Sequence, residues 1–160
     1  MIDFLNKASS GISINNVVYR KPTQVYRSGA SEFGIGGYNI VSGRAWHFKL
    51  PFDCRLKTSL NSLEFIACMI TIWVDCSEEI NSEDCILSLT DSTSAFGWLR
   101  KSNVVDKLNM QVQLTMACQL ANLVIDHDCC LYRQWFTGEF NTVACLSRDF
   151  HLNDSSLTLL

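Results

Sequence analysis

The chain has 160 residues, of which 48% are hydrophobic and 18% are charged, with only two prolines and eight glycines. This composition can bury a core and excludes a disordered tail or a collagen-like repeat, and the length is that of one domain, so we treat residues 1–160 as a single domain. The formal net charge of −3 is unlike that of domains that bind nucleic acid by charge alone, because those are usually basic.

Three segments with strand character come first along the chain. The first consists of Val17-Val18-Tyr19 and Val25-Tyr26, which flank Lys21-Pro22, a pair that should interrupt the pairing or place it at an edge. The next two segments are Gly34–Val41, which is glycine-rich and then β-branched, and Ala45–Leu50, which alternates. Turn-forming residues separate the three segments and predict an antiparallel meander.

A helix, a buried strand and a second helix are predicted next. The first helix is capped by Asn61 or Ser62, and its apolar stripe consists of Leu63, Ile66, Ile70 and Trp73. Cys85–Thr90 is a compact apolar run that suits a buried central strand. A short helix from Ser92 to Lys101 follows directly, with Asp91 or Ser92 as its cap.

A long helix, a last strand and a short helix complete the predicted elements. The long helix runs from about Val105 to Ile125, and its stripe consists of Leu108, Val112, Met116, Leu120 and Leu123. Leu131–Phe136 alternates like a strand, Gly138–Asn141 turns the chain, and residues 142–148 can form one or two helical turns. This order favours an α/β fold with a mixed sheet and helices on its faces. Asp91 falls at the carboxyl end of the central strand, where open α/β sheets place their sites.

The N-terminal segment, the apolar runs and the cysteines indicate where in the cell the protein is expected. No charged segment followed by an apolar stretch starts this sequence, so we expect an intracellular protein, cytoplasmic or nuclear. The most apolar run, Phe65–Val74, is far shorter than the ~20 residues of a membrane span, so we expect no membrane association. The eight cysteines form no Cys-x-x-Cys pair and are expected to be reduced thiols. Cys68, Cys85 and Cys118 should act as small core residues.

Four local motifs follow one another in a recognisable order. They are Tyr26–Gly37 (YRSGASEFGIGG), Asn61–Ala67 (NSLEFIA), Leu89–Asn103 (LTDSTSAFGWLRKSN) and Phe136–Asp149 (FTGEFNTVACLSRD). These motifs resemble the first hairpin, helix A, the segment with the third catalytic carboxylate and the closing motif of ribonuclease H domains of retroelement reverse transcriptases, DIRS-like ones among them. The likeness covers about residues 17–152. It implies a ribonuclease H-like mixed five-stranded sheet that begins with a three-strand antiparallel meander and is flanked by helices.

The resemblance also implies an activity and its partners. Domains of this family cleave the RNA strand of an RNA/DNA hybrid, with four carboxylates that hold two Mg²⁺ or Mn²⁺ ions. Mg²⁺ prefers oxygen ligands and keeps waters and substrate phosphate in its shell. The expected partners are therefore an RNA/DNA hybrid or other nucleic acid, a divalent cation and a reverse transcriptase polymerase domain.

Two of the four carboxylates match and two do not. Glu64 matches the helix A glutamate and Asp91 matches the strand-end aspartate, so both are expected to be catalytic and to bind metal. Gly29 stands where the family has the aspartate of Ser-Asp-Ala-Ser. Cys145 stands where the family has Val-Ala-Asp, and the motif here is one residue short. We therefore expect a degenerate site that holds a single ion weakly, with little or no nuclease activity.

Alternatives remain open for these residues. Asp91 can serve only as a helix cap, Glu64 as a solvated helix-face residue and Gly29 as part of a β-bulge. Arg100 and Lys101 either contact hybrid phosphates or are simply solvated. Four acids are conceivable replacements for the missing carboxylates, although the first has the opposite strand parity to Gly29: Glu32, Asp126, Asp128 and Asp149.

Three functions from different classes remain possible. The first is a hybrid-specific ribonuclease of a retroelement. The second is a catalytically inactive nucleic-acid-binding or structural domain, like the connection-type domains of reverse transcriptases. The third is a decayed remnant of an element. The missing carboxylates and the acidic pI of about 5.5 favour the second and third over an efficient enzyme.

Overall fold

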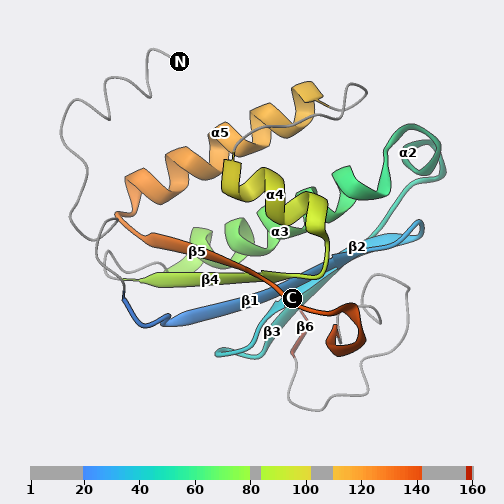
Figure 1. The fold of residues 1–160 in the computed structure, drawn as a ribbon. Coiled ribbons are helices and arrows are strands. Elements are labelled where there is room, and N and C mark those ends of the chain that lie inside the picture. The colour runs from blue at the N-terminus through green and yellow to red at the C-terminus, as the bar shows by residue number, and fades with distance from the viewer. Residues whose placement is uncertain (1–19, 80–83, 102–109, 142–157, 160) are drawn as a thin grey trace.

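The computed structural model describes residues 20–79, 84–101, 110–141 and 158–159 (Figure 1). Its strands form one sheet in the order β5-β4-β1-β2-β3-β6. Their bounds are β1 Gln24–Ala30, β2 Gly34–Asn39, β3 Arg44–Lys49, β4 Cys85–Thr90, β5 Cys130–Trp135 and β6 Thr158–Leu159. Strands β1, β2 and β3 form an antiparallel meander, whereas β4 pairs in parallel with both β1 and β5. The predicted meander-first mixed sheet is confirmed, and β6 adds a two-residue strand parallel to β3.

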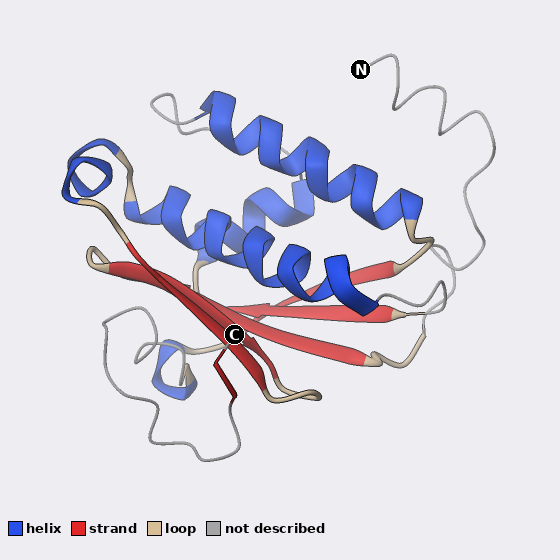
Figure 2. Cartoon of the chain, turned by 180° about the vertical axis from the view of Figure 1, so that it is seen from behind, coloured by secondary structure: helices blue, strands red, loops and turns tan. Residues whose placement is uncertain are grey.

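The helices that cover the sheet lie on one of its faces (Figures 1 and 2). Their bounds are α2 Phe52–Lys57, α3 Leu60–Glu79, α4 Thr93–Lys101 and α5 Met110–Asp126, and a 3₁₀ turn η2 spans Gly138–Phe140. Helix α3 packs on β1 and β2, and α4 and α5 pack on α3. The turn η2 lies beyond the end of β5, on the side of the sheet away from these helices (Figures 1 and 2).

The helix starts differ in detail from the predictions. The hydroxyl of Ser59 accepts a hydrogen bond from the backbone N–H of Ser62 at 3.2 Å, so α3 begins earlier than the expected cap at Asn61 or Ser62. Helix α2 was not predicted, because Pro51 ends the preceding strand and only six residues follow before the next break. Ser92 caps α4 as one of the two expected residues, since its Oγ accepts a hydrogen bond from the N–H of Ala95 at 3.1 Å.

The buried face of α3 is wider than the predicted stripe. Leu63 is buried as predicted, and Ile66 and Ile70 pack against the core cluster that contains it, whereas Trp73 is 58% exposed. A second cluster takes Phe65, Cys68, Met69 and Ile72 from the same helix. The run from Phe65 to Val74 is apolar nearly all round, so its spacing leaves the buried side undecided.

On helix α5, too, only some of the residues of the predicted apolar stripe are buried. Leu120 is buried, and Met116 and Leu123 pack against the core, but Val112 is 51% exposed. Cys118, expected to be a small core residue, is exposed, whereas Cys68 and Cys85 are buried as predicted. The helix buries only one narrow side, so an apolar residue outside that side remains at the surface.

Several predictions fall on residues outside the described ranges. These are the pairing of residues 17–19, the placement of Leu108 and the short helix over 142–148. Within the described ranges, no helix is both long and apolar enough to cross a membrane.

Candidate active site at the carboxyl end of β4

Glu64 links helix α3 to the end of strand β1. Its Oε1 accepts a hydrogen bond from the backbone N–H of Ala30, the last residue of β1, at 3.0 Å. Its second oxygen, Oε2, is buried and has no hydrogen-bond partner within the described residues. A buried carboxylate oxygen without a partner is costly unless a proton or a cation satisfies it.

The surroundings of Glu64 favour its protonated form. Burial raises the pKa of Glu64 from 4.5 to about 7, the hydrogen bond from Ala30 opposes the rise, and the charge of Asp91 adds to it. The alternative that Glu64 is a solvated helix-face residue is therefore wrong. The effect of Asp91 also means that the two acids, far apart in the sequence, lie close enough for their charges to interact.

Asp91 lies half-buried directly after β4. Its backbone carbonyl accepts a hydrogen bond from the indole Nε1 of Trp135 at 2.9 Å, which holds the end of β4 to the end of β5. Its carboxylate has no hydrogen bond or ion pair with the part of the chain that the structure describes. Because Ser92 caps α4, the alternative that Asp91 serves only as a cap is wrong.

Gly29 lies near the end of β1, and Asp91 directly follows β4, the strand that pairs with β1 in parallel. Strand β1 pairs with β4 so that Arg27 lies opposite Leu89, and two residues further along both strands the same register reaches Gly29 and Asp91. Since side chains alternate along a strand, a side chain at position 29 would lie on the same face as that of Asp91. The ladder between β1 and β2 runs through Gly29, opposite Gly36, without interruption, so the β-bulge alternative is wrong.

A buried hydrogen bond joins β1 to α3 near the two acids. Ser28 Oγ donates a hydrogen bond to Cys68 Sγ at 3.0 Å, and both side chains are buried. Burial raises the pKa of the Cys68 thiol to about 11, so this cysteine stays protonated. Cys68 lies one turn after Glu64 on α3, and its contact with Ser28 therefore fixes which side of α3 faces β1.

The segment after β5 contributes two neighbours of the site that the sequence did not predict. A Cβ atom at Gly138 would lie 3.2 Å from Oδ2 of Asp91, so a side chain there would press on that carboxylate and require it to shift. Asn141 Nδ2 donates a hydrogen bond to the carbonyl of Ser28 at 3.4 Å, which brings the end of η2 back to β1. The glycine of the predicted turn was the only sequence signal, and it did not identify Asp91 as the neighbour.

The two predicted basic residues lie away from the acids. Arg100 is exposed near the end of α4. Helix α4 starts two residues after Asp91, and at about 1.5 Å per residue Arg100 lies roughly 10 Å further along its axis. Lys101 is the last residue of α4, and its side chain lies outside the described part of the structure. The structure therefore does not bring Arg100 into the acidic site.

The conceivable replacement acids are not beside Gly29 in the described residues. Glu32 is exposed in the turn between β1 and β2. Asp126 and Asp128 precede β5, and because β4 and β5 are parallel these two acids lie at the opposite end of the strands from Asp91. Cys145 and Asp149 fall outside the described ranges.

The described residues fit one cation better than two. Glu64 and Asp91 are the residues that would hold it, since one has a buried unpartnered oxygen and the other a carboxylate without a protein partner. No group of three or more His, Cys, Asp and Glu side chains that could hold a metal occurs in the described ranges. The four-carboxylate, two-ion arrangement implied by the resemblance is therefore not present in them.

Comparison with known proteins identifies the fold. No protein-family model and no curated protein matches the sequence. RNase H1 from the halophilic archaeon Halobacterium salinarum matches with a TM-score of 0.57 at 10% identity, over 79% of this chain and 96% of that one. The N-terminal RNase H domain of a Mycobacterium tuberculosis protein, solved as a fusion with maltose binding protein, matches with a TM-score of 0.54 at 14% identity, over 79% and 93%. The chain therefore has a ribonuclease H-like fold, in which Asp91 follows the end of the parallel strand β4 and its charge acts on Glu64.

Proposed function

We propose that this chain is the ribonuclease H-like domain of a retroelement reverse transcriptase, with a metal-dependent but impaired cleavage of RNA in RNA/DNA hybrids. The observation that carries the proposal is the position of Gly29. It lies level with Asp91 and one residue before the backbone N–H that binds Glu64. The sequence around it resembles a family motif that has an aspartate at this position. The fold comparisons support the nuclease class, and the motifs support the retroelement source.

The site residues explain why activity is expected to be weak. A divalent cation at such a site supplies an activated water and stabilises the leaving oxygen. Asp91 and the ionised form of Glu64 would bind one such ion from two sides, while Ala30 orients Glu64. A second ion nearby would meet too little negative charge to offset the repulsion between the two cations. Gly29 contributes no ligand atom, so the acidic site of this chain is incomplete.

A binding or structural role without chemistry is the second candidate. The net charge of −3 favours it, because a hybrid-binding domain that acts alone needs a basic face. In that case the domain would gain affinity from an adjoining polymerase domain. A decayed remnant would show neither hybrid binding nor restorable cleavage, so the experiment below separates the three possibilities.

The test restores the missing aspartate. Wild type, Gly29→Asp and Gly29→Asp combined with Asp91→Asn are incubated with an end-labelled RNA/DNA hybrid and either Mg²⁺ or Mn²⁺. We expect slow or no cleavage by the wild type and a gain of at least about tenfold in Gly29→Asp, because a carboxylate ligand adds charge beside the ion. The added Asp91→Asn change should abolish the gain.

Gly29→Asn is the matched control, since asparagine has nearly the same shape as aspartate but no charge. It should fold like Gly29→Asp and show no gain in cleavage. A second variant adds an aspartate after Ala144 to the Gly29→Asp background, which completes the closing motif. If both restored variants are folded and bind hybrid but do not cleave, the match between Gly29 and the family aspartate is wrong. Rapid cleavage by the wild type would overturn the impairment.

A further inference from the structure

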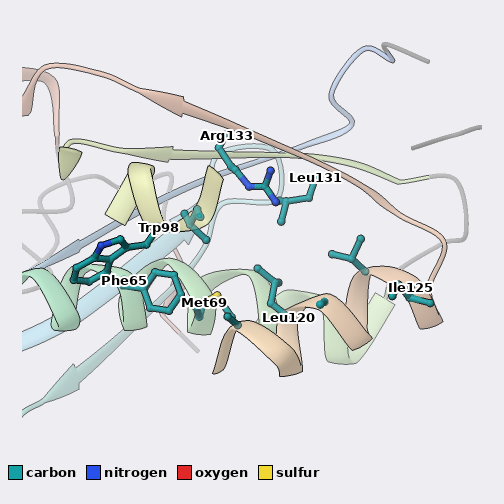
Figure 3. Close-up of a pocket in the computed structure, with 11 residues that line it drawn as sticks. Phe65, Met69, Trp98, Leu120, Ile125, Leu131 and Arg133 are labelled. Atoms are coloured by element: carbon teal, nitrogen blue, oxygen red, sulfur yellow. The ribbon is translucent and has the colours of Figure 1, made fainter. Parts of the chain in front are cut away.

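An apolar cavity of about 220 Å³ lies between helices α3, α4 and α5 and strand β5 (Figure 3). The residues that line it include Phe65, Met69, Trp98, Leu120 and Leu131. Phe65 and Trp98 contact each other edge to face, with ring centroids 5.9 Å apart and an angle of 73° between the rings. This pair gives one end of the cavity a rigid aromatic wall. None of the lining residues belongs to the acidic site.

Arg133 is the only charged residue among those that line the cavity. Figure 3 shows its guanidinium directed from β5 toward the space between Trp98 and Leu131. Arg133 is exposed at the surface, and the side chains around it partly desolvate its guanidinium, which lowers its pKa. It has no hydrogen bond or ion pair with the part of the chain that the structure describes. A cation in this position, at the rim of an apolar space, is complementary to an anion with an apolar body.

We propose that this cavity binds a small organic acid, with its apolar body between α3 and α5 and its carboxylate on Arg133. Apolar cavities of roughly 150 Å³ admit benzene, so this one has room for a single ring with a short side chain. A guanidinium presents a planar pair of N–H donors that matches the two oxygens of a carboxylate. This site is independent of the proposed nuclease function.

A neighbouring apolar hollow provides an internal comparison. It has a volume of about 290 Å³, shares Met69 and Leu120 with the first cavity, and lies on the other side of them, against Trp73 and Met116. None of the described residues that line it is charged. An apolar compound without an acid group therefore has no electrostatic reason to prefer the Arg133 cavity, whereas an acid does.

The test compares two probes of nearly the same shape, 3-phenylpropanoate and its uncharged amide, with acetate as the anion alone. Binding to the wild-type chain is followed by calorimetry and by the NMR shift of the Trp98 indole N–H. We expect the acid to bind about tenfold more tightly than the amide, because a charge-assisted hydrogen bond is stronger than a neutral one. Acetate should not bind detectably, since it leaves the cavity unfilled.

Two variants test separately the contribution of the Arg133 charge and that of the cavity volume. Arg133→Gln should bring the acid to the affinity of the amide, and Arg44→Gln, the same change on β3 away from the cavity, should leave the acid unaffected. Ala121→Phe places a ring in the cavity and should abolish binding of both probes while the melting temperature is kept. Equal binding of acid and amide to the wild type overturns the proposal. So does a lack of acid binding, or acid binding that survives in Arg133→Gln or Ala121→Phe.

Discussion

The backbone N–H of Ala30 donates a hydrogen bond to Oε1 of Glu64 at 3.0 Å, while Oε2 of the same carboxyl is buried without a partner in the described residues. One oxygen is therefore oriented by the end of β1, and the other is available to a proton or a cation. The charge of Asp91 acts on the same group. This arrangement makes Glu64 sensitive to pH, to metal and to any new charge at position 29.

Glu64 should make the free energy of unfolding depend on pH. Its pKa in the folded chain is about 7 against an ordinary value of 4.5, so between these values the folded state binds more protons than the unfolded state. The contribution of protonated Glu64 to the free energy of unfolding is fully present below about pH 4.5. It is lost as the pH rises through about 7, and the total loss is at most roughly 3 kcal/mol. Glu64→Gln should flatten this dependence, because the amide oxygen can still accept from Ala30. Urea unfolding between pH 4 and 8 in the presence of a chelator measures it.

Glu32→Gln is the control for that experiment. Glu32 is exposed in the turn after β1, so its neutralisation should leave the pH dependence as in the wild type. A wild-type curve that is already flat, or that rises from pH 5 to 7, would contradict the burial of Glu64.

A divalent ion should bind beside Glu64 and Asp91. Mn²⁺ added at pH 8 should broaden the amide NMR signals of Ala30 and Asp91 before those of β3, because a paramagnetic ion relaxes the nearest nuclei. Asp91→Asn should remove the effect at the same concentration, and Gly29→Asp should produce it at a concentration about tenfold lower, since each carboxylate adds a ligand and a charge. Broadening that begins elsewhere, or that persists in Asp91→Asn, would place the ion at another site.

Gly37 should tolerate no side chain. A Cβ atom there would collide with Oγ1 of Thr71 and lie 2.9 Å from the backbone carbonyl of Arg27. The Thr71 hydroxyl cannot move away freely, because it donates to the carbonyl of Ala67 at 2.7 Å and accepts from Trp46 Nε1 at 3.2 Å. Gly37→Ala should therefore lower the free energy of unfolding by about 2–4 kcal/mol in urea titrations.

Gly97→Ala is the matched control for Gly37→Ala. Gly97 lies inside α4, and a Cβ atom there would meet nothing within 4 Å. Alanine favours the helix by about 1 kcal/mol over glycine, so this variant should be more stable than the wild type. Equal effects of the two substitutions would show that the packing of β2 against α3 is looser than described.

Arg100 should contribute to hybrid binding only through phosphate contact. It is exposed and roughly 10 Å along α4 from the acidic site, by the rise of about 1.5 Å per residue. Arg100→Gln should weaken hybrid binding several-fold and reduce the slope of log K against log salt by about 1. Lys21→Gln, at an exposed position on the first described segment, serves as the comparison. An unchanged slope in Arg100→Gln would leave it as a solvated residue.

Local sequence patterns predicted the correct bounds of some elements, but they did not predict which side of every helix is buried. Cys85–Thr90 was predicted with its observed bounds, because an apolar run of this length, bounded by polar residues, is too short for a typical helix and suits a buried strand. On α3 the predicted stripe was right at Leu63 and wrong at Trp73, because nearly every side of this helix carries apolar residues and the surfaces packed against it decide which of them are buried. Trp73 is exposed and Phe65 is buried for that reason.

The sequence by itself determined the mixed sheet and the order of its five main strands, and its motifs singled out Glu64 and Asp91, because periodicity, caps and motifs are local properties. Only the tertiary structure decided that Gly29 lies level with Asp91, that Glu64 is buried against Ala30, and that Gly138 borders the Asp91 carboxylate. Those relationships join residues that lie 34 to 62 positions apart in the sequence. They depend on strand register and on the packing of α3, which are set by the burial of whole faces rather than by any one segment.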